Sequence, residues 1–446
     1  MKKVITYGTY DLLHYGHIKL LERAKALGDY LIVGITSEDF DKSRGKINVK
    51  QSLMERFKAV EETGLADEII VEEYEGQKID DIFKYGIDVF TVGSDWEGTF
   101  DYLKEYCEVV YLPRTEGISS SELRTQKRKI KLGLIGESLY LNKMLIESKY
   151  VNGVDVTEVC FEDEANNHTD FFEEVHQNVN YEEMLEKIDA VYIISNPQKH
   201  YQQIKLALEK GKHVLCESPI TLSKLQTNEL FELAKNNKCI LMEAIKTAYS
   251  TAYSRMRLLL KGGIIGKVVS VDATCTSLKD FDKANINLSN TWNSLEAWGP
   301  TALLPIFQIL GLNYRNKLHV SSNIDLNNNF DLFSKIDFIY DNAVASIKVG
   351  SGVKSEGELI ISGTKGYIYV PAPWWKTDYF EVRYEDQTRN RRYFYKLDGE
   401  GIRLELVSFV RSIEEGRINS NIDEKVSLEI GKIMEDYIKG NDLILI

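Results

Sequence analysis

The hydrophobic positions in the first part of the chain form short apolar runs that alternate with helix-periodic segments. An apolar run at residues 4–7 is followed by a glycine and then by residues 18–27, where apolar side chains recur with helical spacing. The alternation continues with predicted strands at 30–35, 68–71 and 89–92 and predicted helices at 53–62 and 79–84. Alternating strands and helices imply a parallel sheet that binds ligands at the carboxyl ends of its strands. We therefore predict a first α/β domain over residues 1–128.

A second strand and glycine turn follow a short basic connector. Residues 130–136 are an apolar run ending in glycine, and residues 190–194 have the pattern of a buried strand, which indicates a second α/β domain over 129–245. Residues 246–446 differ, because successive alternating strands indicate antiparallel pairing and two helices close the chain. Those strands are predicted at 267–275, 332–340, 343–349, 358–362, 367–370, 379–384 and 392–396, and the helices at 404–413 and 426–437.

Composition and charge narrow the class of partners. The 446 residues are 43% hydrophobic and 28% charged, which is ordinary for a globular protein with a sizeable core. A net charge of −13 argues against nucleic acid or an anionic membrane surface as the main partner, so a phosphorylated substrate would need local basic residues. The five cysteines lack CxxC spacing, and we find no signal peptide or long apolar span. We therefore expect reduced thiols in a cytoplasmic protein.

The most informative stretch is GTYDLLHYGH, residues 8–17, between the first strand and the first helix. A strand that feeds a helix through glycine directs backbone N–H groups and the positive helix end at one point, which suits a phosphate. Gly8 allows close backbone approach and Thr9 adds a hydroxyl, while His14 and His17 can donate protons to the same anion. This arrangement suits attack on the α-phosphate of a nucleotide, where positioning and charge neutralisation dominate. Taken alone, the two histidines could equally be cap and surface residues.

Three later stretches strengthen the nucleotide interpretation. The loop at 41–46 contains three cations, residues 93–98 follow a strand, and residues 114–121 place an arginine before a hydroxyl-rich helix start. Together with the histidine motif, phrases such as DLLHYGHIKLLERAKALGDY and CEVVYLPRTEGIS resemble the glycerol-3-phosphate cytidylyltransferases of the HxGH nucleotidyltransferase superfamily. The resemblance covers nearly all of residues 1–125 and implies a Rossmann-like fold for this domain.

The resemblance implies transfer of CMP from CTP, with Mg²⁺, to a phosphorylated polyol, releasing pyrophosphate. It gives catalytic roles to His14, His17, Lys46 and Arg114. It also implies that nucleotide and acceptor are bound by Gly8, Thr9, Tyr10, Asp11, Arg44, Lys78, Asp95, Thr115, Gly117, Ile118, Ser119 and Ser120. One departure is the stretch Tyr74-Glu75-Gly76-Gln77-Lys78, where the family has a tryptophan just before the lysine. We expect this change to admit an acceptor longer than glycerol phosphate.

The glycine turn of the second domain is an incomplete dinucleotide fingerprint, because Gly136-Glu137-Ser138 lacks the later glycines. The phrases SNPQKH at 195–200, ALEKGKHVLCESP at 207–219 and LMEA at 241–244 resemble the glucose–fructose oxidoreductase and inositol dehydrogenase family. The resemblance implies a Rossmann domain that binds NADH or NADPH, followed by an α+β domain with a large, mostly antiparallel open sheet. It implies cofactor contacts from Gly133, Gly136, Ser138, Ser195, Asn196, His200 and Glu217.

The catalytic groups of that family are altered here. Ser218 occupies the place of the usual lysine acid, and Pro300 and Leu304 lie where relatives carry further catalytic groups. Lys246 follows closely and could polarise a ketone and donate the proton, unless it is a surface lysine. A degenerate Rossmann domain kept for dimerisation is the competing interpretation. Of the tryptophans 292, 298, 374 and 375, we expect at least two in the core and the others in a sugar pocket. We predict no metal-ligand cluster.

The combined hypothesis is a bifunctional enzyme that joins CTP, a sugar phosphate and NAD(P)H into a CDP-alditol for cell-surface polymer. Fructose 6-phosphate is the favoured ketose phosphate and ribulose 5-phosphate the next. Two alternatives stay open: a plain glycerol-3-phosphate cytidylyltransferase with an inert Rossmann appendage, and a second half that senses cytidine nucleotides. Glu162 and Asp163 favour NADH, because carboxylates would repel a 2′-phosphate. We expect a homo-oligomer, dimer or tetramer, and no nucleic-acid or membrane partner.

Overall fold

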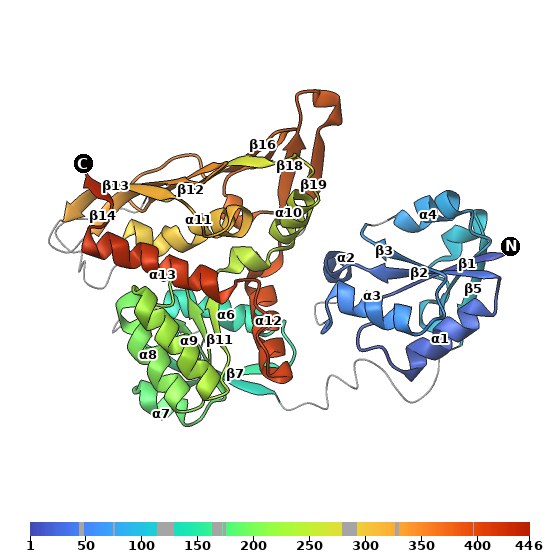
Figure 1. Cartoon of the computed structure of the whole chain (residues 1–446). Helices are drawn as coiled ribbons and strands as arrows, with labels where there is room; N and C mark the ends of the chain where they lie inside the picture. The colour runs from blue at the N-terminus through green and yellow to red at the C-terminus, as the bar shows by residue number, and fades with distance from the viewer. Residues whose placement is uncertain are drawn as a thin grey trace. The chain divides into compact units, whose positions relative to one another are not determined.

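The computed structural model divides the chain into two compact units, Met1–Arg128 and Lys129–Ile446. It describes residues 1–43, 49–74, 76–113, 129–162, 172, 175–278, 292–325, 330–395 and 397–446. Figure 1 labels the helices and strands of both units. Among the described residues, every helix is too short or too polar to cross a membrane.

The first unit is a parallel sheet of five strands in the order β3-β2-β1-β4-β5, as the alternating pattern predicts. Its strands are β1 (Lys3–Gly8), β2 (Tyr30–Thr36), β3 (Glu68–Glu72), β4 (Val89–Gly93) and β5 (Glu108–Leu112). Its helices are α1 (Tyr15–Lys25), α2 (Glu38–Ser43), α3 (Leu53–Glu62) and α4 (Gln77–Tyr85), with short 3-10 helices η1 (Ser94–Trp96) and η2 (Asp101–Glu105).

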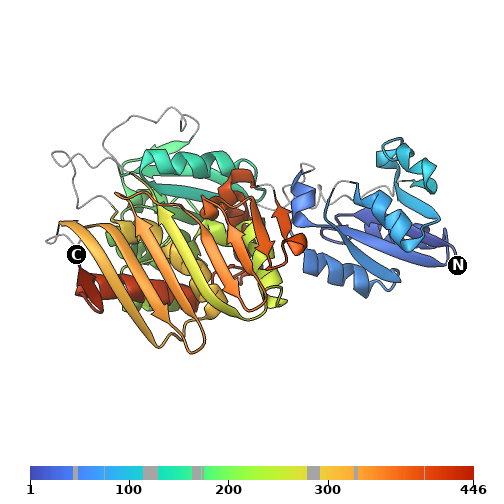
Figure 2. The ribbon, with the colours of Figure 1, turned by 90° about the horizontal axis from the view of Figure 1, so that it is seen from above.

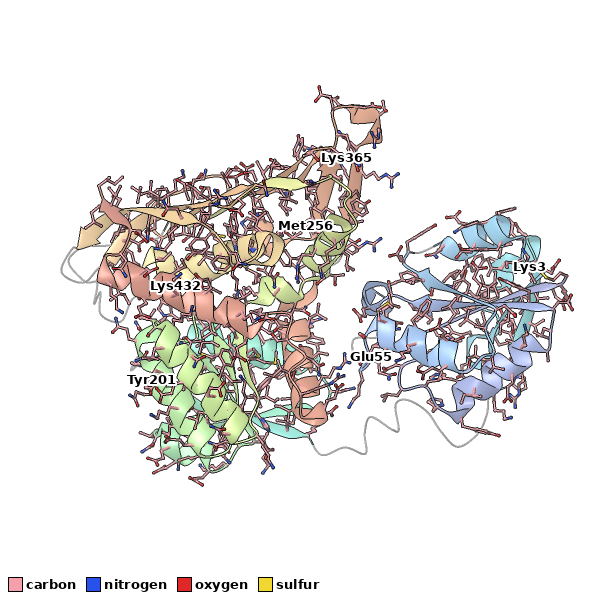
Figure 3. The ribbon with its side chains drawn as sticks, in the orientation of Figure 1. Lys3, Glu55, Tyr201, Met256, Lys365 and Lys432 are labelled. Atoms are coloured by element: carbon pink, nitrogen blue, oxygen red, sulfur yellow. The ribbon has the colours of Figure 1, made fainter. Side chains whose placement is uncertain are left out.

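Both faces of this sheet are covered, because neighbouring side chains of a strand point to opposite faces. Val4 packs in a cluster with residues of α1 and α3, whereas Ile5 packs in a cluster with residues of α4 and η2. The helix α3 begins with a capping box, in which Ser52 accepts from the Glu55 backbone and the Glu55 side chain accepts from Ser52. Figure 3 labels Glu55 at this helix start.

The second unit contains a parallel sheet of six strands in the order β11-β10-β9-β6-β7-β8. Its strands are β6 (Ile130–Gly136), β7 (Val154–Phe161), β8 (His176–Asn178), β9 (Ala190–Ile194), β10 (His213–Glu217) and β11 (Leu241–Ala244). Its helices are α6 (Ser138–Ser148), α7 (Tyr181–Leu185), α8 (Pro197–Glu209) and α9 (Lys224–Asn236). In Figure 1 α8 and α9 cover one face, while α6 lies beside α12 (Ile402–Glu415) on the other.

The second unit also contains a sheet of nine strands in the order β19-β18-β17-β16-β12-β15-β14-β13-β20, seen side by side in Figure 2. They are β12 (Val268–Thr276), β13 (Asn316–Asp325), β14 (Phe330–Ile339), β15 (Val344–Gly350), β16 (Leu359–Gly363), β17 (Tyr367–Val370), β18 (Tyr379–Arg383), β19 (Arg391–Phe394) and β20 (Leu443–Leu445). The pairs β12–β15 and β13–β20 are parallel and the others antiparallel, so the predicted, mostly antiparallel open sheet is confirmed.

The second unit has further helices and 3-10 helices. They are η4 (Lys246–Tyr249), α10 (Thr251–Lys261), α11 (Ser294–Leu310), η6 (Trp374–Lys376), η7 (Gln387–Arg389), η8 (Asp398–Gly401), α12 and α13 (Glu424–Lys439). Of these, α11, η6 and η7 join strands within the large sheet. One hydrophobic cluster runs from Leu132 of β6 to Phe338 of β14, so the two sheets share a core. The division of this unit at residue 245 therefore stays a prediction.

Candidate functional site

The first candidate site lies at the carboxyl ends of β1 and β4, which are neighbours in the five-stranded sheet. The chain runs from β1 outward to β2 and β3, and then returns to place β4 and β5 on the other side. Such a reversal of strand order opens a crevice for ligands. Gly8 and Thr9 stand at the end of β1, and Asp95 stands exposed in η1 at the end of β4.

His14 and His17 form the reactive pair of this crevice. The helix α1 begins at Tyr15, so His17 lies in its first turn, earlier than the predicted helix start at residue 18. The two imidazole rings stack with centroids 3.9 Å apart and planes 19° apart. His14 is the N-cap, and its Nδ1 accepts from the Gly16 N–H at 3.1 Å. Burial lowers the pKa of His14. The neutral ring therefore keeps its proton on Nε2, where it can be donated to a phosphate oxygen.

The turn between β1 and α1 has a constrained backbone. Tyr10 and Leu12 have φ angles of 52° and 50°, a region that non-glycine residues seldom adopt. The Tyr10 side chain is buried, with 1% exposed, and its ring would lie 3.0 Å from a Cβ at Gly8. Gly8 therefore allows Tyr10 to fold back over the end of β1. Strained turns of this kind are typical of ligand sites.

Arg56 holds this turn in place, and the sequence analysis missed it. Its guanidinium is fully buried and donates to the carbonyl oxygens of Thr9 and Thr36, both at 2.8 Å, and of Gln51 at 3.1 Å. Asp41 lies 3.6 Å from the same guanidinium and accepts from the Thr9 hydroxyl at 2.7 Å. The Thr9 hydroxyl, expected to face the nucleotide, thus orients the turn. The available signal was the spacing of Arg56 and Val60 on the buried face of α3.

Two predicted binding residues make structural contacts. Asp11 is 2% exposed, and its Oδ1 accepts from the backbone N–H groups of Lys50 at 3.0 Å and Gln51 at 2.9 Å. Lys78 is 7% exposed, pairs with Glu72, and has its ammonium 4.8 Å from the centroid of the Tyr7 ring. Glu72 already neutralises Lys78, so the role of Lys78 in holding an acceptor phosphate stays a prediction.

The remaining predictions for this site lie mostly outside the described residues. Asp41, predicted in a loop, belongs to α2, because this helix extends to Ser43. The predicted residues outside the described ones are Arg44, Lys46, Arg114, Thr115, Gly117, Ile118, Ser119 and Ser120.

The second candidate site lies at the carboxyl ends of β6 and β9, where the six-stranded sheet also reverses its strand order. Gly136 ends β6, and a Cβ there would lie 2.6 Å from the Ile194 carbonyl oxygen. Only glycine allows this approach of the two strands. Gly133 lies inside β6, where a Cβ would meet Ile188 Cδ1 at 2.7 Å, so Gly133 has a packing role and its cofactor contact stays a prediction. Ser138 begins α6, whose N-terminus points at this edge.

The turn from β9 to α8 is built by residues predicted to contact the cofactor. Ser195 is buried and its hydroxyl donates to Gln203, while Asn196 caps α8 by accepting from the Gln198 N–H at 3.0 Å. His200 is fully buried, with Nδ1 2.8 Å from the Pro219 carbonyl oxygen and Nε2 2.8 Å from that of Ser195. Burial lowers the pKa of His200 to about 4. These buried side chains therefore hold the β9–α8 turn in place at the edge of the site.

Glu162, at the end of β7, is held by α8. It accepts from Gln203 Nε2 at 2.8 Å and lies 3.3 Å from the Lys199 ammonium. These contacts offset the charge that favoured NADH, so the cofactor preference stays a prediction. Asp163 lies outside the described residues.

Lys246 lies among carboxylates at the second site. Its ammonium donates to Glu400 Oε2 at 2.5 Å, and its charge acts on Glu217 and Glu405. Glu217, at the end of β10, accepts from the Tyr192 hydroxyl at 2.7 Å, and burial raises its pKa. Burial and the charge of Glu217 raise the pKa of Glu405, which is 1% exposed. Lys246 is therefore an oriented cation within a polar network, not an isolated surface lysine.

The altered positions of the family motif have packing roles. The Ser218 hydroxyl donates to Glu243, a buried carboxyl on β11 whose pKa is raised by burial. Pro300 and Leu304 are buried inside α11. Of the four tryptophans, Trp374 is buried, and the half-buried Trp298 and Trp375 pack against the same hydrophobic cluster, in agreement with the expectation of at least two in the core. Trp292 is half-buried. In the part of the chain that the structure describes, no group of three or more His, Cys, Asp or Glu could hold a metal ion.

Comparison with known proteins separates the two units. The profile described as cytidylyltransferase-like matches residues 5–126, and that of an oxidoreductase family with an NAD-binding Rossmann fold matches residues 132–245. A glycerol-3-phosphate cytidylyltransferase of Bacillus spizizenii is 56% identical over 124 residues, which are 28% of this chain and 95% of that protein.

The second unit has more distant relatives. A scyllo-inositol 2-dehydrogenase (NADP(+)) of Bacillus subtilis is 27% identical over 266 residues, 57% of this chain and 79% of that protein. A 3-ketoreductase from Actinomadura kijaniata, solved in complex with NADP and TDP-benzene, superposes with a TM-score of 0.63 at 18% identity. That superposition covers 72% of this chain and all of the other, and at this identity it shows the fold.

Proposed function

We propose that this chain, which belongs through its first unit to the cytidylyltransferase-like family, synthesises a CDP-activated alditol. Its second unit carries the Rossmann fold of an NAD-binding oxidoreductase family. The single observation that carries the proposal is the presence, in one chain, of the His14–His17 pair at the switch point of the five-stranded sheet and of the Lys246 network beyond the carboxyl ends of β10 and β11 in the six-stranded sheet. One site transfers CMP and the other reduces a carbonyl.

In the transfer step, a phosphate oxygen of the acceptor attacks the α-phosphorus of CTP. A new P–O bond forms, the bond to the bridging oxygen breaks, and pyrophosphate leaves with the negative charge. His14 donates from Nε2 to the α-phosphate, and His17, stacked on it, lies within reach of the same charge. The described residues do not form a metal cage. Mg²⁺ would therefore be held mainly by the CTP phosphates, as is usual for this ion.

The test of this step is His17→Ala. Loss of a positioned donor to the developing charge should lower the rate on the order of 10²–10⁴-fold with the fold intact. Pyrophosphate release from CTP and a panel of sugar phosphates is the measurement. Unchanged turnover in the variant would reject the assignment.

A nicotinamide dinucleotide suits the second site, because the glycine turn at Gly136 leads from β6 into α6, whose N-terminus offers backbone N–H groups to a diphosphate. The cofactor supplies hydride to the carbonyl carbon. Lys246 gives a proton to the carbonyl oxygen, and solvent restores the proton. Glu400 and Glu217 orient the ammonium for this transfer.

Replacement of the proposed acid tests the reduction step. Lys246→Met should abolish NAD(P)H oxidation and spare CMP transfer, while Ser218→Ala should retain both activities. If Ser218→Ala is inactive and Lys246→Met is active, Lys246 is not the acid.

The acceptor loop supports a ketose phosphate longer than glycerol phosphate. Gly76 has a φ of 89°, and a Cβ there would meet no atom within 4 Å among the described residues. Tyr74 beside it is 49% exposed. Fructose 6-phosphate is the favoured substrate and ribulose 5-phosphate the second; Glu75 lies outside the described residues.

The order of the two reactions is cytidylylation first and reduction second. Ser218 replaces the usual lysine acid, so the acid at the carbonyl is weaker. Contacts between the enzyme and a nucleotide attached to the substrate, away from the carbonyl, could compensate for this loss. The Actinomadura ketoreductase holds TDP-benzene together with NADP, which is in keeping with a nucleotide-linked substrate. With CTP and fructose 6-phosphate alone, a CDP-ketose should accumulate, and added NAD(P)H should consume it. Oxidation of NAD(P)H by the ketose phosphate without CTP, at the full rate, would reverse the order.

One observation favours a second candidate, a glycerol-3-phosphate cytidylyltransferase with an inert second unit. The Ser218 hydroxyl is engaged with Glu243, so the usual lysine acid has no replacement at its own position. Calorimetric titration with NADH and NADPH separates the two candidates. The proposal also includes assembly into a dimer or tetramer, which light scattering would measure.

A further inference from the structure

Three lysines from separate elements converge on one carboxylate in the second unit. Glu400 of η8 lies 2.5 Å from the ammonium of Lys246, 2.6 Å from that of Lys376 on η6, and 3.5 Å from that of Lys143 on α6. Although burial opposes ionisation, the hydrogen bonds from Lys246 and Lys376 lower the pKa of Glu400 to about 2. Three cations therefore share one fixed anion.

Three ammonium groups meet the one carboxylate of Glu400, so lysines outnumber carboxylates in these contacts. Two further carboxyls, Glu217 and Glu405, act on Lys246. The neighbouring Arg403 pairs with Glu147, which cancels both charges. The side chains of Lys143 and Lys376 are 56% and 38% exposed, against 28% for Lys246. The excess positive charge thus faces solvent at Lys143 and Lys376.

The backbone beneath the cluster is held in an unusual conformation. Glu400 has a φ of 54° between Gly399 at 60° and Gly401 at 94°. A Cβ at Gly401 would lie 2.5 Å from the Lys246 carbonyl oxygen, so η8 packs directly against the segment that carries Lys246. Backbone of this kind is found at ligand clamps.

An aromatic pair adjoins the lysines. Lys376 follows Trp375, whose ring centroid lies 4.9 Å from that of Trp298, with the planes 58° apart. The Thr247 hydroxyl donates to the Trp375 carbonyl oxygen at 3.0 Å, which ties η4 to η6. Both rings are half-buried. Lysines bind phosphates, and indole rings stack on bases, so the two features together match a nucleotide.

We propose that Lys143 and Lys376, positioned by Glu400, bind the diphosphate of a nucleoside diphosphate, and that the Trp298–Trp375 pair contacts its base. The proposal rests on the proposed function, since the ligand would be the CDP-linked ketose. Its base would then contact the two tryptophans and its diphosphate would contact Lys143 and Lys376. Its carbonyl would lie at Lys246.

Calorimetric titration of the full chain with CDP tests the proposal. The wild type should bind two CDP molecules, one in each unit. The double variant Lys143→Met/Lys376→Met should weaken one of them about 100-fold, since each charged hydrogen bond is worth roughly tenfold or more. The matched control is Lys205→Met/Lys235→Met, because these lysines are 34% and 51% exposed and also pair with glutamates. It should keep both sites. Equal thermal unfolding of the variants shows that the second unit is folded.

The outcomes are separable from those of the proposed function. CDP affinities in the double variant that equal those of the wild type would overturn the site, whether the wild type binds one CDP or two. These results stand whether or not the wild type oxidises NAD(P)H, and that oxidation tests the proposed function. Inorganic pyrophosphate is a second probe. If it binds as tightly as CDP, and Trp375→Leu changes neither affinity, the base contact is wrong.

Discussion

Replacement of Arg56 by methionine should destabilise the first unit more than any exposed substitution on the same helix. The variant leaves three carbonyl oxygens, those of Thr9, Thr36 and Gln51, without their charged donor. It also leaves Asp41, which is 1% exposed, without its cation at 3.6 Å. Removal of one partner of a buried ion pair lowers the free energy of unfolding by about 3–5 kcal/mol. This value already includes the lost hydrogen bonds of the guanidinium. For a unit of this size, that loss corresponds to a fall of roughly 10–20 °C in Tm.

Scanning calorimetry of the full chain measures this effect, and added CTP identifies the transition of the first unit because a ligand stabilises the unit that binds it. Lys58→Met is the matched control, since Lys58 lies on the same helix in an exposed pair with Glu62 at 3.9 Å. The control should leave Tm within experimental error. Asp41→Asn combined with Arg56→Met should recover part of the loss, because no buried charge then remains unpaired. If Arg56→Met lowers Tm no more than Lys58→Met does, the buried network does not hold the turn.

Two further predictions concern the switch-point residues. Gly136→Ala should weaken NAD(P)H binding and lower the Tm of the second unit, because its Cβ would lie 2.6 Å from the Ile194 carbonyl oxygen. Cofactor fluorescence measures the binding. Unchanged affinity would contradict the cofactor site, and an unchanged Tm would contradict the close approach. His14 has its pKa lowered by burial, so the unfolded chain binds the proton more tightly and the first unit should lose stability as pH falls below about 6.5. Urea midpoints across that range should fall less in His14→Gln, and equal slopes in both proteins would contradict the assignment.

Local patterns predicted those elements whose signals are contiguous. The bounds of α3, β9 and β17 agree with the prediction, because apolar spacing and flanking polar residues define them within a few positions. The helix α11 was missed, since Pro300 and Pro305 inside it argue against a helix. It forms nonetheless because most of its side chains are buried and Asn293 and Glu296 provide a capping box.

Residues far apart in the sequence could not be joined by pattern. The HxGH pair was found because His14 and His17 share one helix start. Lys246 was found as a cation, but its partner Glu400 is 154 residues away and has no local signature. The strand β13 was missed because its sequence is polar, and its pairing with β14 and β20 places it in the sheet.

The hydrophobic cluster that spans both sheets of the second unit determines where the chain can be divided without splitting a core. The clusters of the first unit contain residues of that unit alone. In the second unit, by contrast, Leu215 of β10 and Phe338 of β14 belong to one cluster. Recombination at the joint after Arg128 would exchange a complete core, whereas recombination near residue 245 would leave half of one on each fragment. The first unit could therefore be exchanged by itself, whereas the second unit could be transplanted only as a whole.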